Sequence, residues 1–456
     1  MMLSKTKLVA FASSPQGIFA IIAVFFGLFF LIITPPFQEP DGYEHFMRIF
    51  SISEGQFLAK GISVPQSVYD LVVNVSPDPL PGNFPNKQSK QALLIQFQQP
   101  FDDITPVEVD FIATRYTSPF AYIPQSVGLM FGRLFNPPAI ILFYLARLFN
   151  FTVWVLGITL AVKITPIFKW VFVLVALMPM TLFLGASISP DGLLIAACFL
   201  WIAKIFQISF QAGQKFVILD GIFLGGLIML IALLKPGYVA LVLLVFFIPK
   251  AHFKSFIQRL GLTVLMISLA LIPSVLWQVI LANTMDPFSA FNADPAAQLQ
   301  NVLHAPMGFI GILFTNLFAQ AIKYFQSFVG VLGWLDTPLP DYMYILFACV
   351  LVLVSLFDHA EGIKVPLWCR VSAAVFSLFL MLGLMTGLYI SITPLGALDL
   401  EGFQGRYLIP FAPLALLIFH NLRISFSKRY LRMVGIFSAF ALVVALRVLL
   451  TRYYAI

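Results

Sequence analysis

Charged residues are scarce in this sequence: Asp, Glu, Lys and Arg make up 10% of its 456 residues, and hydrophobic residues make up 60%. A soluble chain typically carries about 25% charged residues. Many apolar runs approach or exceed the roughly 18 residues that cross the hydrocarbon core of a bilayer. The runs are apolar throughout rather than alternating, so they predict membrane helices and exclude the strands of a β-barrel.

Cysteine and clustered charge are also scarce. The three cysteines, Cys198, Cys349 and Cys369, lie in apolar surroundings, which excludes a disulfide framework and a cysteine metal centre. The net charge of +7 comes from scattered basic residues, a pattern that does not favour nucleic-acid binding. The sequence shows neither an internal repeat nor the matching pairs of interrupted helices that many transporters have.

What is present is a succession of apolar runs. We predict an all-α polytopic membrane protein with about eleven spanning helices, within a range of about 10 to 13. The predicted spans are 17–34, 139–162, 168–186, 191–209, 217–234, 237–250, 259–283, 342–357, 367–392, 407–421 and 432–451. The first run follows Lys5 and Lys7, lacks a small-residue cleavage site and ends in Pro-Pro, so we interpret it as an uncleaved anchor.

Two further segments, 118–134 and 306–330, are predicted to lie as helices at the outer interface. A spanning arrangement is the alternative for both. We divide the chain into a module at 1–250, which includes a long first outer loop at 35–138, and a more variable module at 251–456. The second module contains an outer region at 284–341.

The orientation follows from the basic residues. With the N-terminus inside, 15 of the 27 basic residues and only three of the 20 acids (Asp220, Asp358 and Glu361) fall on inside segments. This asymmetry satisfies the positive-inside rule. The inside basic residues are Lys5, Lys7, Lys163, Lys169, Lys204, Lys215, Lys250, Lys254, Arg259, Lys364, Arg370, Arg423, Lys428, Arg429 and Arg432.

Several unusual polar stretches then fall on the outer side. They are TPPFQEPDGYEHFMR at 34–48, GASISPDG at 185–192, Lys235-Pro236-Gly237, GWLDTP at 333–338 and EGFQGRY at 401–407. Ionisable groups at membrane depth are costly unless they face a polar cavity. We therefore predict one polar cavity at the outer leaflet, formed by loops that are far apart in the sequence.

The order of these motifs resembles the GT-C superfamily of membrane glycosyltransferases, over roughly residues 17–250 and 400–410. Asp41 and His45-Phe46 resemble the acidic motif after the first helix of that superfamily, with Gly42 in place of its usual glutamate. The set PDxxxHF, SxSxDG and QGRY resembles more closely an uncharacterised family of bacterial polytopic membrane proteins. The resemblance implies transfer of a sugar from a polyprenyl-phosphate donor at the extracytoplasmic face, with inversion.

The resemblance also implies roles for individual residues. Asp41 is the preferred base for the acceptor hydroxyl, with Glu44 and His45 as catalytic neighbours. The simpler interpretations are solvated loop acids, a helix cap and a structural histidine. For the donor phosphate we expect Arg406, Lys235, Arg147 and Gln404, because arginine binds phosphate through two hydrogen bonds. Snorkelling to headgroups and structural pairing are the alternatives.

Acceptor or donor contacts are expected from a further set: Glu39, Arg48, Arg115, Tyr116, Ser189, Asp191, Asp336 and Tyr407. Arg48 lies one helical turn after Glu44 and can instead pair with it. Asp191 can instead stabilise a helix start, and Asp336 can belong to a simple turn. Since Asp191 is one acid among serines, we predict no metal ligands. We name no cofactor, and a divalent cation stays an alternative without an acid cluster to support it.

The predicted partners are a polyprenyl-phosphate-linked sugar, an envelope glycan, lipid or protein acceptor, membrane lipid, and a donor synthase and flippase. No nucleic acid is expected. The predicted location is the bacterial cytoplasmic (inner) membrane, with the active site on the extracytoplasmic side. A transporter or flippase for an envelope precursor is the main alternative, and a polysaccharide polymerase or ligase and a structural membrane protein are the others.

Overall fold

The computed structural model describes residues 5–75, 90–102, 105–211, 213, 216–285, 293–358, 362–421, 430 and 432–454. Six of its helices are long and apolar enough to cross a membrane. They are α2 (Pro15–Ile33), α7 (Ala139–Ile164), α10 (Asp191–Phe210), α12 (Phe256–Thr284), α17 (Leu367–Ile392) and α20 (Met433–Tyr453). The prediction of a polytopic membrane protein is thus confirmed in its coarse form.

The count of eleven spans is not confirmed, because the other five predicted spans are shorter or interrupted helices. Three of them are α11 (Ile218–Leu234), η2 (Pro236–Phe247) and α16 (Asp341–Phe357). The predicted span 168–186 divides into α8 (Lys169–Ala176) and α9 (Pro179–Gly185), since a proline disfavours helical backbone in the residue before it. The span 407–421 divides into η4 (Gly405–Phe411), α18 (Ala412–Ala415) and η5 (Leu416–Phe419).

The two segments predicted at the interface are helical. Residues 118–134 form the 3-10 helix η1 (Pro119–Tyr122) and α6 (Ile123–Arg133), which has 11 residues and is too short to span a bilayer. Residues 306–330 form α14 (Pro306–Ala319) and α15 (Ala321–Val329). A bend of 106° separates α14 from α13 (Pro295–His304), and the two make a seventh candidate span only if they count as one.

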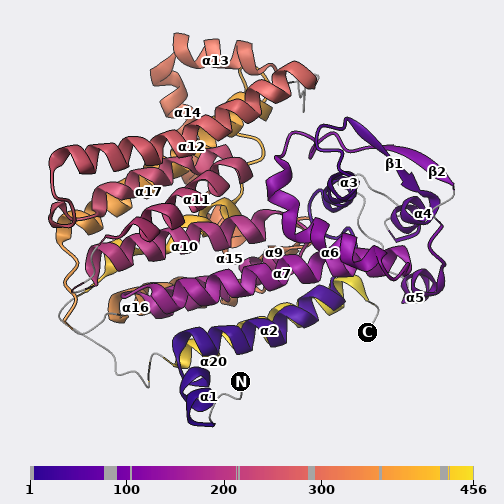
Figure 1. Cartoon of the computed structure of the whole chain (residues 1–456), viewed down its shortest axis with the longest axis horizontal. Coiled ribbons are helices and arrows are strands. Elements are labelled where there is room, and N and C mark those ends of the chain that lie inside the picture. The colour runs from indigo at the N-terminus through magenta and orange to yellow at the C-terminus, as the bar shows by residue number, and fades with distance from the viewer. Residues whose placement is uncertain are drawn as a thin grey trace.

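The first outer loop folds into a small unit at one end of the helix bundle (Figure 1). It contains α3 (Gly42–Ser53), α4 (Gln66–Val75) and α5 (Lys90–Gln98), together with strands β1 (Gly61–Pro65) and β2 (Pro106–Asp110). The strands pair antiparallel, with Gly61 opposite Asp110. A second antiparallel pair joins β3 (Val331–Leu332) to β4 (Thr337–Pro338). The protein is therefore helical with two small sheets, which the all-α prediction omitted.

Within the bundle, α7 contacts both α2 and α10, and α10, α11 and α12 pack in chain order (Figure 1). The last helix, α20, packs on the first spanning helix, α2, and η4 packs on α10. Two short helices, α1 (Lys5–Ala12) and η3 (Lys250–His252), complete the described elements. Elements from both predicted modules thus contact each other, and the division near residue 250 stays a prediction.

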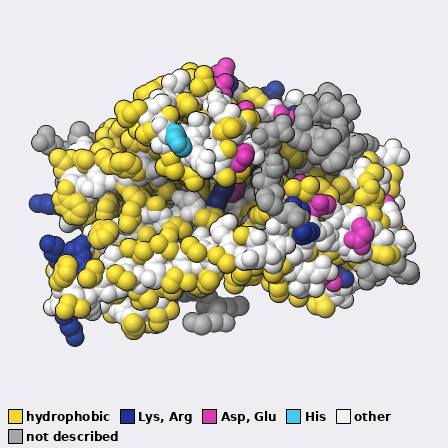
Figure 2. Space-filling view, turned by 90° about the horizontal axis from the view of Figure 1, so that it is seen from above, with side chains coloured by type: hydrophobic (Ala, Val, Ile, Leu, Met, Phe, Trp, Pro, Cys, Tyr) yellow, Lys and Arg dark blue, Asp and Glu magenta, His cyan; other side chains and the backbone are white. Residues whose placement is uncertain are grey.

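Charge is unevenly distributed along the bundle. Figure 2 shows Lys and Arg side chains without Asp or Glu at one end of the molecule, and side chains of both signs in the middle and toward the other end. At the basic end, Lys169 Nζ donates to the carbonyls of Val162 and Lys163, 3.0 and 2.9 Å away, at the C-terminus of α7. Of the residues used to orient the chain, Lys215, Arg423, Lys428, Arg429 and Glu361 lie outside the described residues.

Candidate functional site

A polar cavity of about 310 Å³ lies where the first outer loop meets the helix bundle. Its polar lining comes from six separate segments of the chain. These are Asp41 and His45 around the start of α3, residues of the 113–118 segment, Ser189 and Asp191 around the start of α10, Lys235 after α11, Trp277 and Gln278 of α12, and Arg406 and Tyr407 of η4. The cavity thus brings together eight of the predicted site residues: Asp41, His45, Tyr116, Ser189, Asp191, Lys235, Arg406 and Tyr407.

Asp191 lies between two cations in this cavity. Its carboxylate oxygens are 3.6 Å from Lys235 Nζ and 4.0 Å from Arg406 Nη1. Lys235 Nζ also lies 4.1 Å from the centre of the Tyr407 ring, a cation–π distance. Arg406 Nε is buried and has no hydrogen-bond partner among the described residues. These long ion pairs leave both cations with hydrogen-bonding capacity for an anionic ligand.

Asp41 has an unusual backbone and a free carboxylate. Its φ is 57°, in the left-handed region, and a backbone bond of 3.0 Å from Gly42 N to Glu39 O closes the turn. Asp and Asn tolerate this conformation better than other non-glycine residues. Although Asp41 occupies the N-cap position of α3, its side chain makes no capping hydrogen bond. The helix-cap interpretation is therefore not supported, and the exposed carboxylate is free to face a ligand.

The turn also explains why glycine follows Asp41. A Cβ atom at Gly42 would lie 3.0 Å from the Cα of Phe37 and 3.1 Å from the Cγ of Glu39. A glutamate at this position would force the turn to shift. The second carboxylate of the cavity comes instead from Asp191, on a different loop.

His45 is hydrogen-bonded to a buried tyrosine that we did not predict. Its Nδ1 lies 2.7 Å from the hydroxyl oxygen of Tyr122, which is completely buried in η1. Burial lowers the pKa of His45, and the charge of Asp41 partly opposes this effect. The imidazole is thus favoured in its neutral form.

A buried ion pair lies beneath the cavity. Arg147 of α7 and Glu39 are both completely buried, with Nη2 and Oε2 2.6 Å apart. Arg147 also donates to the carbonyls of Leu31, Thr34 and Pro35 at distances of 2.6 to 3.2 Å. These contacts attach the end of α2 and the following turn to α7, so Arg147 and Glu39 support the cavity without lining it.

The other carboxylate oxygen of Glu39, Oε1, extends this network to the loop at 185–192, which carries Asp191. It accepts a hydrogen bond of 3.3 Å from Ile188 N. Asn150 of α7 donates from Nδ2 to the carbonyls of Ser187 and Ser189, at 2.9 and 3.1 Å. The loops that carry Asp41 and Asp191 are therefore fixed to the same face of α7.

Glu44 and Arg48 lie on α3 outside the cavity lining. The carboxylate of Glu44 accepts a short hydrogen bond from Ala113 N, and burial raises the pKa of Glu44 to about 6. Arg48 is completely buried and donates to the carbonyls of Phe57 and Thr117, at 2.9 and 3.1 Å. The expected Glu44–Arg48 pair is thus replaced by contacts of each side chain with different loop segments.

Three more predicted residues also lie outside the cavity lining. Arg115 donates to the hydroxyl of the neighbouring Tyr116 at 2.8 Å. Gln404 directly precedes η4, and its Oε1 is buried without a hydrogen-bond partner among the described residues. Asp336 pairs with Arg452 of α20, with Oδ2 and Nη2 2.7 Å apart. This pair attaches the β3–β4 turn to the last helix.

The prediction missed five neutral polar or amphipathic residues of the lining: Thr114, Thr117, Ser118, Trp277 and Gln278. Thr114, Thr117 and Ser118 belong to the stretch TRYTSP, whose polar density could have indicated a site. Trp277 and Gln278 interrupt an apolar run near the end of α12. Trp277 Nε1 donates to the Tyr116 carbonyl at 2.9 Å, which holds α12 against the outer loop.

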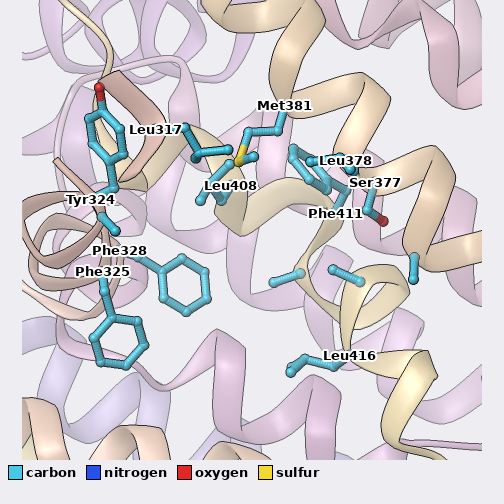
Figure 3. A pocket seen from close by; sticks show the side chains of 14 residues that line it. Leu317, Tyr324, Phe325, Phe328, Ser377, Leu378, Met381, Leu408, Phe411 and Leu416 are labelled. Atoms are coloured by element: carbon cyan, nitrogen blue, oxygen red, sulfur yellow. The ribbon is translucent and has the colours of Figure 1, made fainter. Parts of the chain in front are cut away.

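An apolar cavity of about 390 Å³ lies close by (Figure 3). It is lined by side chains of α14, α15, α17 and the segment from η4 to η5, and Figure 3 labels Phe325, Phe328, Met381, Leu408 and Phe411 among them. The segment that begins at Gly405 therefore contributes Arg406 and Tyr407 to the polar cavity, and its next residue, Leu408, to the apolar one.

No group of three or more His, Cys, Asp or Glu side chains that could hold a metal ion occurs in the described ranges of the chain. In the polar cavity the two carboxylates come from separate loops, and Asp191 faces cations.

Comparison with protein families gives a match over most of the chain. The family described as "Predicted membrane protein (DUF2142)" matches residues 24–415, which include every residue of the polar cavity. No curated protein and no solved structure matches the chain.

Proposed function

Since the chain belongs to this family of membrane proteins, we propose from the chemistry of its polar cavity that it is a GT-C-like glycosyltransferase. It transfers a sugar from a polyprenyl-phosphate donor to an envelope glycan, lipid-linked glycan or protein at the extracytoplasmic face of a bacterial inner membrane. As part of the proposal, the shorter helices complete about eleven crossings together with the long ones.

The observation that carries the proposal is that one cavity holds the free carboxylate of Asp41 together with two cations, Arg406 and Lys235. In the proposed reaction, Asp41 accepts the proton of the acceptor hydroxyl as its oxygen attacks the anomeric carbon. The bond from that carbon to the phosphate oxygen breaks with inversion. Arg406 and Lys235 stabilise the negative charge on the polyprenyl phosphate that leaves.

The neighbouring apolar cavity supports a lipid-linked substrate. Arg406 lies in the polar cavity, and Leu408, two residues later, lies in the apolar one. A phosphate bound at Arg406 would thus lie close to space that suits part of an isoprenoid chain, since burial of each CH₂ group contributes about 0.8 kcal/mol. A soluble nucleotide sugar would make no use of such a cavity.

The test compares envelope glycans and lipid-linked glycans by mass spectrometry in cells without the gene and in cells that carry wild type, Asp41→Asn or Asp399→Asn. Asparagine tolerates the left-handed backbone at residue 41, so Asp41→Asn removes the charge and keeps the turn. Asp399→Asn is the matched control, because Asp399 is an exposed acid in the last outer loop and does not line the cavity.

We expect deletion and Asp41→Asn to lose the same sugar, and Asp399→Asn to restore it. If Asp41→Asn restores the sugar as well as wild type does, Asp41 is not the base. If deletion leaves all glycans unchanged and a solute or lipid accumulates on one side of the membrane, the protein is a transporter or flippase.

A further inference from the structure

The contact between His45 and Tyr122 joins an exposed part of the cavity to a buried hydroxyl. His45 lies on α3 and lines the cavity, whereas Tyr122 lies in η1 and is completely buried. The Nδ1–oxygen distance is 2.7 Å, and the two rings are tilted by 50° with centroids 5.7 Å apart. Because Tyr122 contacts Nδ1 from the buried side, Nε2 is the ring nitrogen that remains for the cavity.

The direction of this hydrogen bond decides which nitrogen carries the proton. A neutral imidazole has one donor and one acceptor nitrogen. The Tyr122 hydroxyl is completely buried, and its proton must go to an acceptor, since a buried hydroxyl without one is costly. Nδ1 of His45 is that acceptor.

Charges in the cavity favour the same arrangement. The carboxylates that act most strongly on His45 are Asp41 and Asp191, which both line the cavity that the ring faces, and Arg406 on the same side opposes them more weakly. Negative charge on that side favours an N–H group directed toward it. The Nε2–H tautomer therefore satisfies the tyrosine on the buried side and the carboxylates on the open side.

We propose that Tyr122 is a positioning residue that holds His45 as the neutral Nε2–H tautomer and directs this single N–H into the cavity as a third donor for a phosphate oxygen, beside Arg406 and Lys235. The phosphate ligand rests on the proposed function, whereas the tautomer does not. A neutral ring also leaves Asp41 free to act as a base, since an imidazolium beside it would stabilise the carboxylate and weaken its basicity.

The tautomer is measured by solid-state NMR of the full chain, labelled with ¹⁵N-histidine and reconstituted in lipid bilayers. The chain has only five histidines, and the signals that disappear in His45→Gln belong to His45. In wild type near neutral pH we expect a protonated Nε2 and an unprotonated, hydrogen-bonded Nδ1. A protonated Nδ1 or an imidazolium would overturn the positioning role, and this readout needs no variant of Tyr122.

Tyr122→Phe then removes the hydroxyl alone. We expect the Nδ1 signal of His45 to lose its hydrogen-bond shift and the two tautomers to mix. Tyr389→Phe is the matched control, because the buried Tyr389 hydroxyl donates to the Ala397 carbonyl, outside the cavity lining. An unchanged His45 spectrum in Tyr122→Phe, or an equal change in Tyr389→Phe, would overturn the proposal.

The anion is tested with inorganic phosphate added to the same samples. We expect phosphate to shift the Nε2 signal of wild type, and Arg406→Ala to weaken this response at least tenfold in phosphate concentration. If the tautomer is as proposed but phosphate leaves Nε2 unchanged, the third-donor role is overturned and the proposed function loses support. If His45 is not the Nε2–H tautomer but phosphate still binds, only the positioning role of Tyr122 is overturned.

Discussion

Replacement of Arg147 by methionine tests the support beneath the cavity. The variant leaves Glu39 as a buried carboxylate without its partner, although Oε2 of Glu39 lies 2.6 Å from Arg147 in wild type. Removal of one member of a buried ion pair costs about 3–5 kcal/mol. The lost contacts of Arg147 with three carbonyls belong to the same cost, because one desolvated side chain makes all of them.

This cost translates into a shift of the melting temperature. The entropy of unfolding is about 2.1 cal/mol/K per residue, or about 1 kcal/mol per degree for 456 residues. Arg147→Met should therefore lower the melting temperature by about 3–5 °C. The shift is larger if unfolding in detergent leaves helices intact, because the entropy change is then smaller. Size-exclusion chromatography of heated, detergent-purified protein measures it.

Two variants make the measurement specific. The double variant Glu39→Gln/Arg147→Met removes both charges and should recover most of the lost stability, because a neutral pair carries no uncompensated charge. Arg452→Met removes a partly exposed partner of Asp336 and should cost less than about 1 kcal/mol. If Arg147→Met melts within 1 °C of wild type, or if the double variant is no better than the single one, the reasoning is refuted.

Three further predictions concern packing and charge. The Cβ of Gly405→Ala would overlap a backbone carbonyl oxygen of α15, whereas a Cβ at Gly226 meets nothing within 4 Å. In the same melting assay we expect Gly405→Ala to lower the stability by about 3 kcal/mol or more and Gly226→Ala to leave it unchanged. Burial raises the pKa of Glu44 from 4.5 to about 6, so the folded state loses stability as the pH rises from about 4.5 to about 6. Glu44→Gln should therefore be more stable than wild type at pH 7.5, by less than about 1 kcal/mol after screening, and equally stable below about pH 4. Asp191→Asn removes the negative charge between two cations, so inorganic phosphate should bind several-fold more tightly in calorimetry at low salt, and unchanged or weaker binding would contradict the anion site.

Hydropathy predicted where the chain is helical better than how long each helix is. The run at 168–186 is apolar throughout, yet it breaks before Pro179, and most of the run at 237–250 belongs to the 3-10 helix η2, which begins at Pro236 and ends at Phe247. Composition measures the preference of a segment for lipid, whereas helix length also depends on backbone hydrogen bonds that proline removes. Packing among neighbours allows such breaks where the backbone is not exposed to lipid.

Eight residues of the cavity were predicted from the side of the membrane that they were expected to share, and the pairing of residues was not. Glu39 and Arg147 were separate candidates in the sequence, 108 positions apart, and only the packing of α2 on α7 makes them partners. Tyr122 lies in an apolar stretch, and nothing in its neighbours distinguishes it from the other tyrosines. Contacts of this kind depend on which helix faces meet, and one sequence does not contain that information.

The two carboxylates of the cavity differ in their surroundings, and this difference assigns their roles. Asp191 is paired with Lys235 and Arg406, so its charge is already balanced by these cations. Asp41 makes no capping bond and faces His45, which is neutral when Tyr122 holds it. Carboxylates in unlike environments commonly take unlike roles in one reaction. In the proposed reaction the base is therefore Asp41, because proton uptake by Asp191 would leave two cations without their counter-charge.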